Sequence, residues 1–276
     1  MFSRLQARMA NRRIVKQRRD AERASALLRE FIASGGSING ETIEAVVKSN
    51  RPAVLEILAK TDPTFLHRAL TFSQEGEDLI LQRLFAGRSQ GFFVDVGAHH
   101  PFRFSNTFLL YVSGWRGINI DATPGSMRAF KTHRPEDINL ECFVGDPSLE
   151  KTLTLYNEPA LNSASPEVIA TRPLRSDTYW PVGTMTTRPQ SLSSILDAHV
   201  PQATPIALLS IDVEGGEQEV LESNNWSRYR PEIIVIEQLS TGIDQSLQHP
   251  TTKFLNTQGY RLIAKAFNSS FFACSV

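Results

Sequence analysis

Short, almost wholly apolar runs recur along the chain, and they limit its possible folds more than any other feature. Five such runs, separated by stretches with helical periodicity, cover residues 91–97, 117–121, 138–144, 206–212 and 232–237. An apolar run of this length without polar alternation indicates a strand that is buried on both faces. Strands of this kind that alternate with helices form a parallel sheet with helices on each side, so we predict a doubly wound α/β fold.

The segments between these runs supply the predicted helices and one irregular region. A capping box at residues 71–74 should begin a helix, and further helices are expected over residues 105–113, 125–134, 216–223 and 249–257. Residues 260–267 and 270–276 should form a closing hairpin. Between 144 and 206 the pattern is irregular, and residues 157–189 hold five of the fifteen prolines. A long connection of this kind is often functional, so we expect a lid or acceptor-binding loop there.

The first seventy residues differ in character from the rest and are predicted to form a separate N-terminal part. Residues 1–19 contain seven Arg and Lys and no acid, whereas residues 20–276 carry 22 basic and 29 acidic side chains. This composition resembles that of an organelle transit peptide, although a solvated helix or a flexible arm is the more ordinary interpretation. Short helices are expected over residues 21–70, as a helical cap or an oligomer surface. Residues 71–276 should form the main domain.

Composition argues against several classes of protein. With 41% hydrophobic and 21% charged residues the chain can bury a core. Its formal net charge of zero gives no overall electrostatic reason to expect a nucleic-acid or membrane partner. No run of about 18 apolar residues predicts a membrane-spanning helix. Cys142 and Cys274 are the only cysteines and match no zinc-ligand spacing, so we expect a reducing, cytoplasmic setting.

Polar residues mark the carboxyl ends of the first three strands, where a doubly wound sheet binds its ligands. Gly97 directly follows the first strand and should let a ligand approach the backbone, but positions 99 and 102 are not the glycines of a dinucleotide fingerprint. Asp121 ends the second strand, where an acid commonly accepts hydrogen bonds from ribose hydroxyls. Asp146 follows the third strand, where it could meet an adenine amino group. Together with Asp95, these acids predict a site for an adenosine compound without pyrophosphate.

Several separated motifs occur in order along the chain: Ser73–Asp78, Phe93–Pro101, Phe104–Thr107, Gly114–Asp121 and Ile211–Gly215. In this combination the chain closely resembles the FkbM family of S-adenosylmethionine-dependent methyltransferases, from about residue 72 to 240. The resemblance implies a class I methyltransferase fold, with a seven-stranded, mostly parallel sheet and a terminal antiparallel hairpin. It also implies methyl transfer to a hydroxyl, in relatives usually of a sugar or a polyketide-type metabolite. Residues 1–70 lie outside it.

The cofactor-binding residues that the resemblance implies are Glu75, Asp78, Asp95, Gly97, Asp121 and Asp146. The first two would close over the cofactor from the helix that precedes the first strand. Asp95 and Gly97 would flank the methionine part, Asp121 would bind the ribose, and Asp146 would bind the edge of the adenine. We expect the loss of the Asp121 carboxylate to weaken cofactor binding and to affect folding little, because it lies at a strand end.

Four residues are candidates to remove the proton of the acceptor hydroxyl: Asp212, Glu214, His99 and His100. The sulfonium methyl is already electrophilic, so catalysis is mainly alignment for in-line displacement together with proton removal. The ordinary alternatives are that the acids cap a helix and that His100 shapes the turn before Pro101. In many relatives a histidine follows the glycine of the Asp-x-Glu-Gly motif, but this chain has Gly216 there. Any catalytic role of that histidine must therefore fall to another residue.

The acids at the later strand ends have a second interpretation. Asp212, Glu214 and Glu237 could hold a divalent cation, because hard oxygen ligands suit magnesium, and the sequence leaves metal dependence open. Within the irregular loop, Trp180 is the aromatic residue that we expect to stack against an acceptor.

Three functions are consistent with these features. The leading one is O-methylation of a small-molecule or glycan acceptor. The second is a binding protein that keeps the fold without turnover. The third is nucleic-acid methylation guided by the basic arm, which the acidic remainder of the chain disfavours. The arm could also contact anionic membranes, where each Lys or Arg contributes about 1 kcal/mol. The N-terminal helices could support a homo-oligomer.

Overall fold

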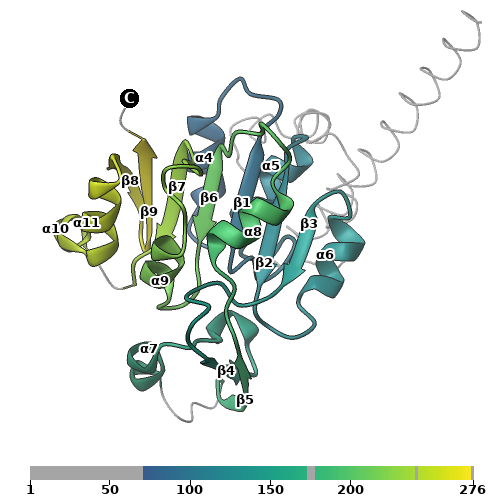
Figure 1. The fold of residues 1–276 in the computed structure, drawn as a ribbon, viewed down its shortest axis with the longest axis vertical. Coiled ribbons are helices and arrows are strands. Elements are labelled where there is room, and N and C mark those ends of the chain that lie inside the picture. Colours follow the sequence, from purple (N-terminus) through teal and green to yellow (C-terminus); the bar gives the residue numbers. More distant parts are fainter. Residues whose placement is uncertain (1–70, 173–177, 240–241, 275–276) are drawn as a thin grey trace, which may run out of the picture. The chain divides into compact units, whose positions relative to one another are not determined.

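The computed structural model describes residues 71–172, 178–239 and 242–274, which belong to one compact unit that begins at Thr71 (Figure 1). The basic arm and the helices expected over residues 21–70 lie outside the described residues. No helix in the described part of the chain has both the length and the apolar character that a membrane crossing needs.

Seven strands form the main sheet in the order β3-β2-β1-β6-β7-β9-β8. They are β1 (Phe92–Val96), β2 (Arg116–Asp121), β3 (Ile138–Glu141), β6 (Leu208–Ile211), β7 (Ile233–Glu237), β8 (Tyr260–Ala266) and β9 (Ser269–Cys274). The first five are parallel, whereas β9 runs antiparallel to both β7 and β8. The predicted parallel sheet with a closing antiparallel hairpin is confirmed.

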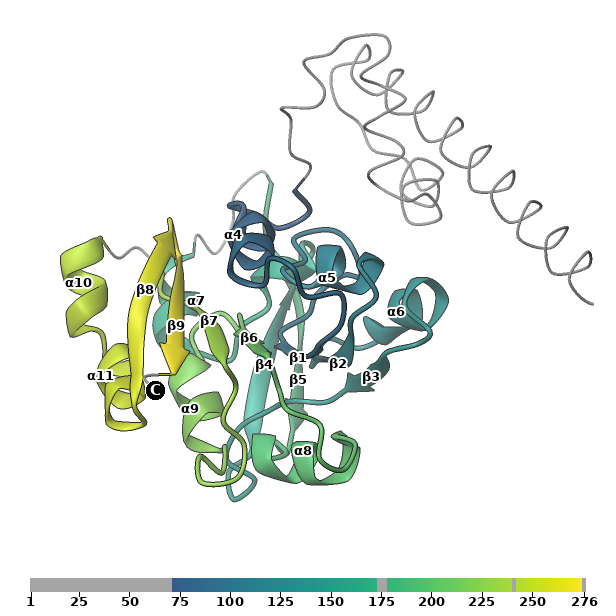
Figure 2. The same cartoon turned by 90° about the horizontal axis from the view of Figure 1, so that it is seen from above.

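Helices cover both faces of this sheet (Figure 2). The helices α4 (Glu77–Leu84), α5 (Phe108–Val112) and α6 (Met127–His133) lie on one side, and α8 (Leu192–His199), α9 (Glu217–Glu222) and α11 (Pro250–Thr257) lie on the other. Alternate strand residues supply the two cores. Val94 packs in the cluster that includes Leu196 and Val220, and Phe93 packs in the cluster that includes Leu81 and Leu110. The short strands are therefore apolar on both faces, as their sequences indicate.

The helices differ from the prediction at several places, and one of them is α8, which lies in the region expected to be irregular. The capping box at residues 71–74 does not form, because α4 begins only at Glu77, after Gly76 in the left-handed region at φ 86°. The hydroxyl of Thr71 donates to the carboxylate of Asp78 instead. A further helix, α10 (Ile243–Gln248), precedes α11 and was not expected.

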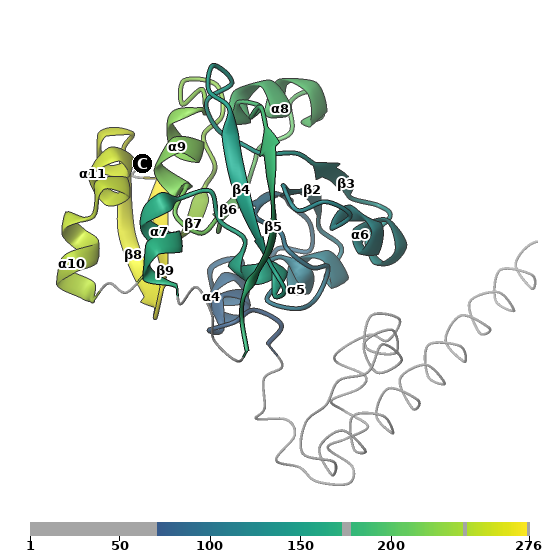
Figure 3. The same ribbon diagram turned by 90° about the horizontal axis from the view of Figure 1, so that it is seen from below.

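The region predicted to be irregular contains regular structure. Between β3 and α8 the chain forms β4 (Lys151–Tyr156), the 3₁₀ turn η2 (Pro159–Leu161), α7 (Pro166–Thr171) and β5 (Pro181–Thr187). The strands β4 and β5 pair antiparallel in a sheet of their own. Figures 1 and 3 show this insertion beyond the carboxyl ends of the parallel strands. The sequence hides it because β5 is largely exposed and threonine-rich, so no apolar run marks it.

Candidate active site

A cavity of about 760 Å³ lies at the carboxyl ends of the parallel strands. The sheet contributes Gly97, Asp121, Asp212 and Glu237, each at or just beyond the end of its strand. The insertion contributes the opposite wall, which includes Leu153, Glu158, Asn162, Val168 and Arg172. The predicted position of the site at this edge agrees with the cavity, and the predicted covering segment lines it.

Several side-chain contacts tie the insertion to the loops that follow the strands. Arg103 and Glu158 form two parallel hydrogen bonds, each 2.9 Å long. Asn162 donates its side-chain amide to the hydroxyl of Thr123 at 2.9 Å. Arg172 forms an ion pair with Glu214. The insertion therefore contacts the loops after β1, β2 and β6, and it covers the cavity from outside the sheet.

The structure requires a glycine at position 97 for packing of the backbone, whereas the sequence suggested that the glycine lets a ligand approach. Its φ is 81°, and a Cβ at this position would lie 2.6 Å from the carbonyl carbon of Asp212 and closer still to its oxygen. The space that a side chain would fill is therefore occupied by the backbone of the neighbouring strand end and not by a ligand. Gly97 still lines the cavity, and its lack of a side chain allows the ends of β1 and β6 to meet there.

Asp121 lines the cavity, and its carboxylate binds backbone N–H groups of the loops around it. One carboxylate oxygen accepts the N–H of Thr123 at 2.7 Å, and the other accepts the N–H of His99 at 2.9 Å. A carboxylate oxygen can accept more than one hydrogen bond, so both oxygens can still receive hydroxyl donors from a ligand. Because this buried carboxylate satisfies two backbone donors, we now expect its loss to lower stability as well as cofactor binding.

The two histidines have different environments, and neither has the geometry of a base. The His99 ring lines the cavity, and its Nε2 lies 3.1 Å from Nη1 of Arg103. Since a guanidinium only donates, Nε2 is the acceptor and the proton sits on Nδ1. Burial lowers the pKa of His99. His99 is thus a neutral donor.

His100 does not line the cavity. Its Nδ1 accepts the backbone N–H of Arg103 at 3.1 Å, and burial lowers its pKa to about 4. This arrangement favours the structural interpretation, in which His100 shapes the turn after β1.

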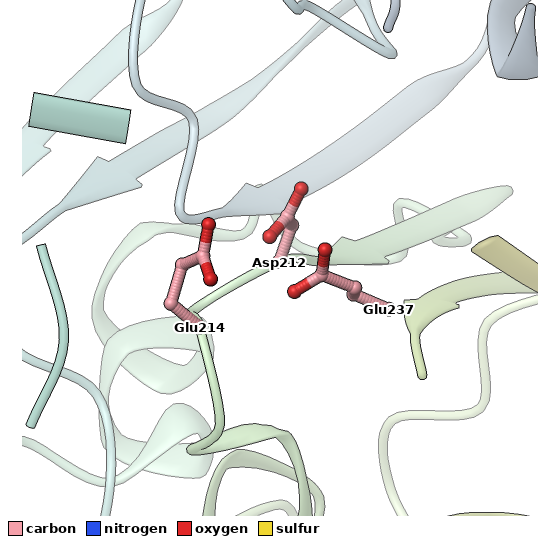
Figure 4. Close-up of side chains that lie close together, drawn as sticks. All are labelled: Asp212, Glu214 and Glu237. Carbon is pink, nitrogen blue, oxygen red and sulfur yellow. The ribbon is translucent and has the colours of Figure 1, made fainter. Parts of the chain in front are cut away.

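Three carboxyl groups converge at the ends of β6 and β7 (Figure 4). One ligand atom from each of Asp212, Glu214 and Glu237 lies within 4.8 Å of the others. Burial raises the pKa of Asp212 and, against the opposing charge of Arg172, that of Glu214. Burial and the neighbouring carboxylates raise the pKa of Glu237 to about 11. The cluster therefore gathers more carboxyl groups than Arg172 can pair with, and burial favours their protonated forms.

The same cluster fits a divalent cation. Its donors are hard oxygens, and Oε2 of Glu237 is buried without a hydrogen-bond partner. Asp212 and Glu237 come from adjacent strands, so the sheet itself sets their separation. The sequence identifies Glu237 as a candidate because it is an acid at the end of a predicted strand.

Four of the predicted cofactor-binding residues do not line the cavity: Glu75, Asp78, Asp95 and Asp146. Glu75 accepts the N–H of Asn268 at 2.8 Å, and Asp78 accepts the N–H of Phe72 at 2.7 Å. Both therefore hold backbone segments together. Gln74, next to Glu75, lines the cavity in their place.

Asp95 and Asp146 are also engaged elsewhere. Asp95 is buried and accepts the hydroxyl of Thr107 at 2.7 Å. Asp146 accepts the N–H of Ser148 at 2.8 Å in a local turn. The wall beyond β3 is formed instead by residues 142–144.

The aromatic residue of the insertion that lines the cavity is Tyr179 and not its neighbour Trp180. Sequence reasoning also missed Arg103, Phe104, Glu158 and Arg172, which line the cavity from loops and from the insertion. No strand-end signal marks these four positions. An Arg–Glu pair 55 residues apart, such as Arg103 and Glu158, has no sequence signature either.

Residues 95–262 match the family described as "Methyltransferase FkbM domain", which covers more than half of the chain. A sequence search of curated proteins finds no match. Among solved structures, the TehB-like SAM-dependent methyltransferase from Corynebacterium glutamicum is 14% identical, with 81% of this chain and 100% of that chain covered and a TM-score of 0.36. The O-methyltransferase from Bacillus cereus in complex with SAH is 11% identical, with 79% and 89% covered and a TM-score of 0.38. CalS11, a TDP-rhamnose 3′-O-methyltransferase of calicheamicin biosynthesis, is 14% identical, with 92% and 93% covered and a TM-score of 0.34.

Proposed function

The chain belongs to the FkbM methyltransferase family, and on that premise we propose that it transfers the methyl group of S-adenosylmethionine to a hydroxyl of a sugar, a glycan precursor or a related metabolite. One observation supports this proposal above the others. The cavity joins Asp121, a strand-end acid suited to ribose hydroxyls, to a cluster of acids at the ends of β6 and β7 that is suited to an acceptor hydroxyl.

The cofactor half of the cavity lies over β1, β2 and β3. Asp121 would accept the ribose hydroxyls, and residues 142–144 would line the adenine. Gly97 and Gln74 would line the methionine part. When bound, S-adenosylmethionine supplies an electrophilic methyl group. The chain orients this group and keeps bulk water out through the insertion above it.

The acceptor half lies over β6 and β7. Asp212 is the residue that we propose as the general base, because its carboxyl group lies at the strand end and faces the cavity. In its ionised form, Asp212 would take the proton of the acceptor hydroxyl as the oxygen attacks the methyl carbon and the carbon–sulfur bond breaks. Arg172 holds Glu214 in an ion pair, whereas Asp212 has no cationic partner among the described residues and shares a side-chain hydrogen bond with Glu237.

A divalent cation is the second role that we propose for the acids, on the strength of their convergence and of the unpartnered oxygen of Glu237. Asp212, Glu214 and Glu237 would hold it, and the cation would polarise the acceptor hydroxyl. Turnover after removal of metal by a chelator separates the two roles. A base needs no added cation, whereas a metal site loses turnover with the chelator and regains it with magnesium.

The test of the function is methyl transfer to defined acceptors. The full chain is incubated with methyl-labelled S-adenosylmethionine and with sugar nucleotides, oligosaccharides or duplex DNA, and the products are analysed by mass spectrometry. We expect label on a hydroxyl oxygen of a carbohydrate, at a rate that falls by about 10²–10⁴-fold when Asp212→Asn replaces the unaltered chain. Transfer to nucleic acid would replace this proposal with the third function, and cofactor binding without transfer to any acceptor would favour the binding protein.

A further inference from the structure

Polar side chains lie side by side across the middle of the otherwise apolar sheet. Asn139, Asn119, Asp95 and Ser210 occupy neighbouring positions on β3, β2, β1 and β6, as the strand register shows. Because side chains alternate along a strand, these four share the face that carries Phe93, under α4, α5 and α6. Asn119, Asp95 and Ser210 are buried. We call these four residues the polar row.

Buried polar groups require partners, and two residues of the polar row, Ser210 and Asp95, find them in one short segment. Asn106 donates its side-chain amide to the hydroxyl of Ser210 at 3.1 Å. The hydroxyl of Thr107 donates to Asp95 at 2.7 Å. Both residues belong to the Phe104–Thr107 motif, for which the proposed chemistry gives no role. The motif is therefore fixed to the sheet by side chains that reach into its core.

Arg134 completes this network from the end of α6. Its side chain is 0% exposed and donates Nη1 to the hydroxyl of Thr107 at 3.0 Å. Its Nε donates to Asp137 at 2.9 Å, and Asp137 in turn accepts the side-chain amide of Asn119 at 3.1 Å. Thr107 thus joins a buried cation to a buried carboxyl group. Loss of its hydroxyl leaves both without that partner.

The motif is also the far end of the loop that lines the cavity. Residues 97–104 run from the end of β1 to this motif and carry two residues with left-handed backbones, His99 at φ 53° and Phe104 at φ 55°. Both line the cavity. Such conformations are strained for residues other than glycine and persist only where the surroundings hold them. At the near end, the N–H of His99 is held by Asp121.

We propose that Thr107, through Asp95 and Arg134, is a positioning residue that fixes the loop of residues 97–104 in the shape that binds the cofactor. This inference rests on the proposed function, because it assigns the loop to the S-adenosylmethionine site. Thr107 does not line the cavity, so it acts through the loop and not by contact. Without its hydroxyl, the strained residues relax and the N–H of His99 leaves Asp121.

The experiment compares two buried threonines in the full chain. Thr107→Val keeps the shape of the side chain and removes the hydroxyl. The matched control is Thr251→Val in α11, whose buried hydroxyl contacts Gln238 and His249 at 2.8 and 2.7 Å. Titration calorimetry gives the Kd for S-adenosylmethionine and S-adenosylhomocysteine, and urea unfolding gives the stability of each variant.

We expect Thr107→Val to raise both Kd values at least tenfold, and Thr251→Val to leave them within twofold at a similar loss of stability. Thr107→Ser, which restores the hydroxyl, should restore the affinity. A folded Thr107→Val chain with Kd values within twofold of the unaltered chain overturns the inference. If Thr107→Val does not fold, Asn106→Ala provides the same readout at a partly buried position, where unchanged Kd values overturn it equally. Failure of the unaltered chain to bind either ligand overturns the proposed function and this inference together.

Discussion

Replacement of Gly97 by alanine should lower the free energy of unfolding, because it disturbs the contact between the ends of β1 and β6 beside the cavity. A Cβ at this position would overlap the backbone carbonyl of Asp212, and the φ of 81° is one that L side chains rarely adopt. The overlap can be relieved only if the ends of β1 and β6 separate. Their separation would strain the hydrogen bond from the N–H of Asp212 to the carbonyl of Val96, which is 2.9 Å long.

The expected loss of stability combines three effects. The left-handed backbone costs about 1–2 kcal/mol for a residue with a Cβ. Overpacking of a close contact costs about 1–3 kcal/mol. A backbone donor left without its acceptor costs about 1–3 kcal/mol. Gly97→Ala should therefore lower the free energy of unfolding by about 3–8 kcal/mol, a large part of the roughly 5–15 kcal/mol of an ordinary domain.

Gly87→Ala is the matched control. Gly87 has almost the same φ, 84°, but a Cβ there would meet nothing within 4 Å. Gly87→Ala should therefore lower the free energy of unfolding only by the cost of the left-handed backbone, about 1–2 kcal/mol. Urea unfolding followed by circular dichroism measures both variants. If Gly97→Ala loses no more stability than Gly87→Ala, the strand ends do not meet at Gly97 as described. Failure of Gly97→Ala alone to yield folded protein would agree with the larger cost.

Four further results are expected. Asp121→Ala should weaken cofactor binding by about 1.5–3 kcal/mol and also lower stability, since two backbone donors lose their acceptor. Asp146→Ala, the control, should leave the cofactor Kd unchanged. Equal Kd values in the two variants would remove the assignment of Asp121 to the ribose. Asp212→Asn should lower turnover about 10²–10⁴-fold with the cofactor Kd within a few-fold, and full turnover would exclude Asp212 both as base and as metal ligand. His100 has a pKa of about 4 in the folded chain against an ordinary 6.5, so the unfolded chain binds more protons between these pH values. The free energy of unfolding should therefore fall as the pH drops from 6.5 to 4. A His100→Gln chain whose free energy of unfolding changes equally steeply with pH would contradict this. Deletion of residues 1–19 should leave the cofactor Kd unchanged. If the arm contacts anionic membranes, the full chain should co-sediment with anionic vesicles at low salt, and the deletion should abolish this binding. The absence of vesicle binding by the full chain at low salt would exclude that contact.

The sequence predicts those parts of the fold and site that follow from strand ends. Apolar runs without alternation predicted the parallel sheet, because only a sheet covered on both faces buries such strands. Gly97 and Asp121 line the cavity because the last residues of parallel strands meet at one edge. Asp212 and Glu237 do so for the same reason.

Side-chain direction and the insertion could not be read in the same way. Asp95 lies inside β1, one residue before its end, and the alternation of the strand turns it onto the face that carries the polar row. Asp146 lies beyond β3, where no periodicity fixes the backbone, and its carboxylate closes a local turn. The hairpin of β4 and β5 joins strands separated by 24 residues and exposes much of β5, so neither an apolar run nor a tight-turn signal reveals it.

Titration calorimetry of the full chain with S-adenosylmethionine and S-adenosylhomocysteine tests the central claim most directly, because it needs no knowledge of the acceptor. Saturable binding of both ligands at one site per chain is predicted, with the affinity for both reduced in Asp121→Ala. The absence of binding by the folded, unaltered chain to either ligand would contradict the assignment of this cavity to S-adenosylmethionine.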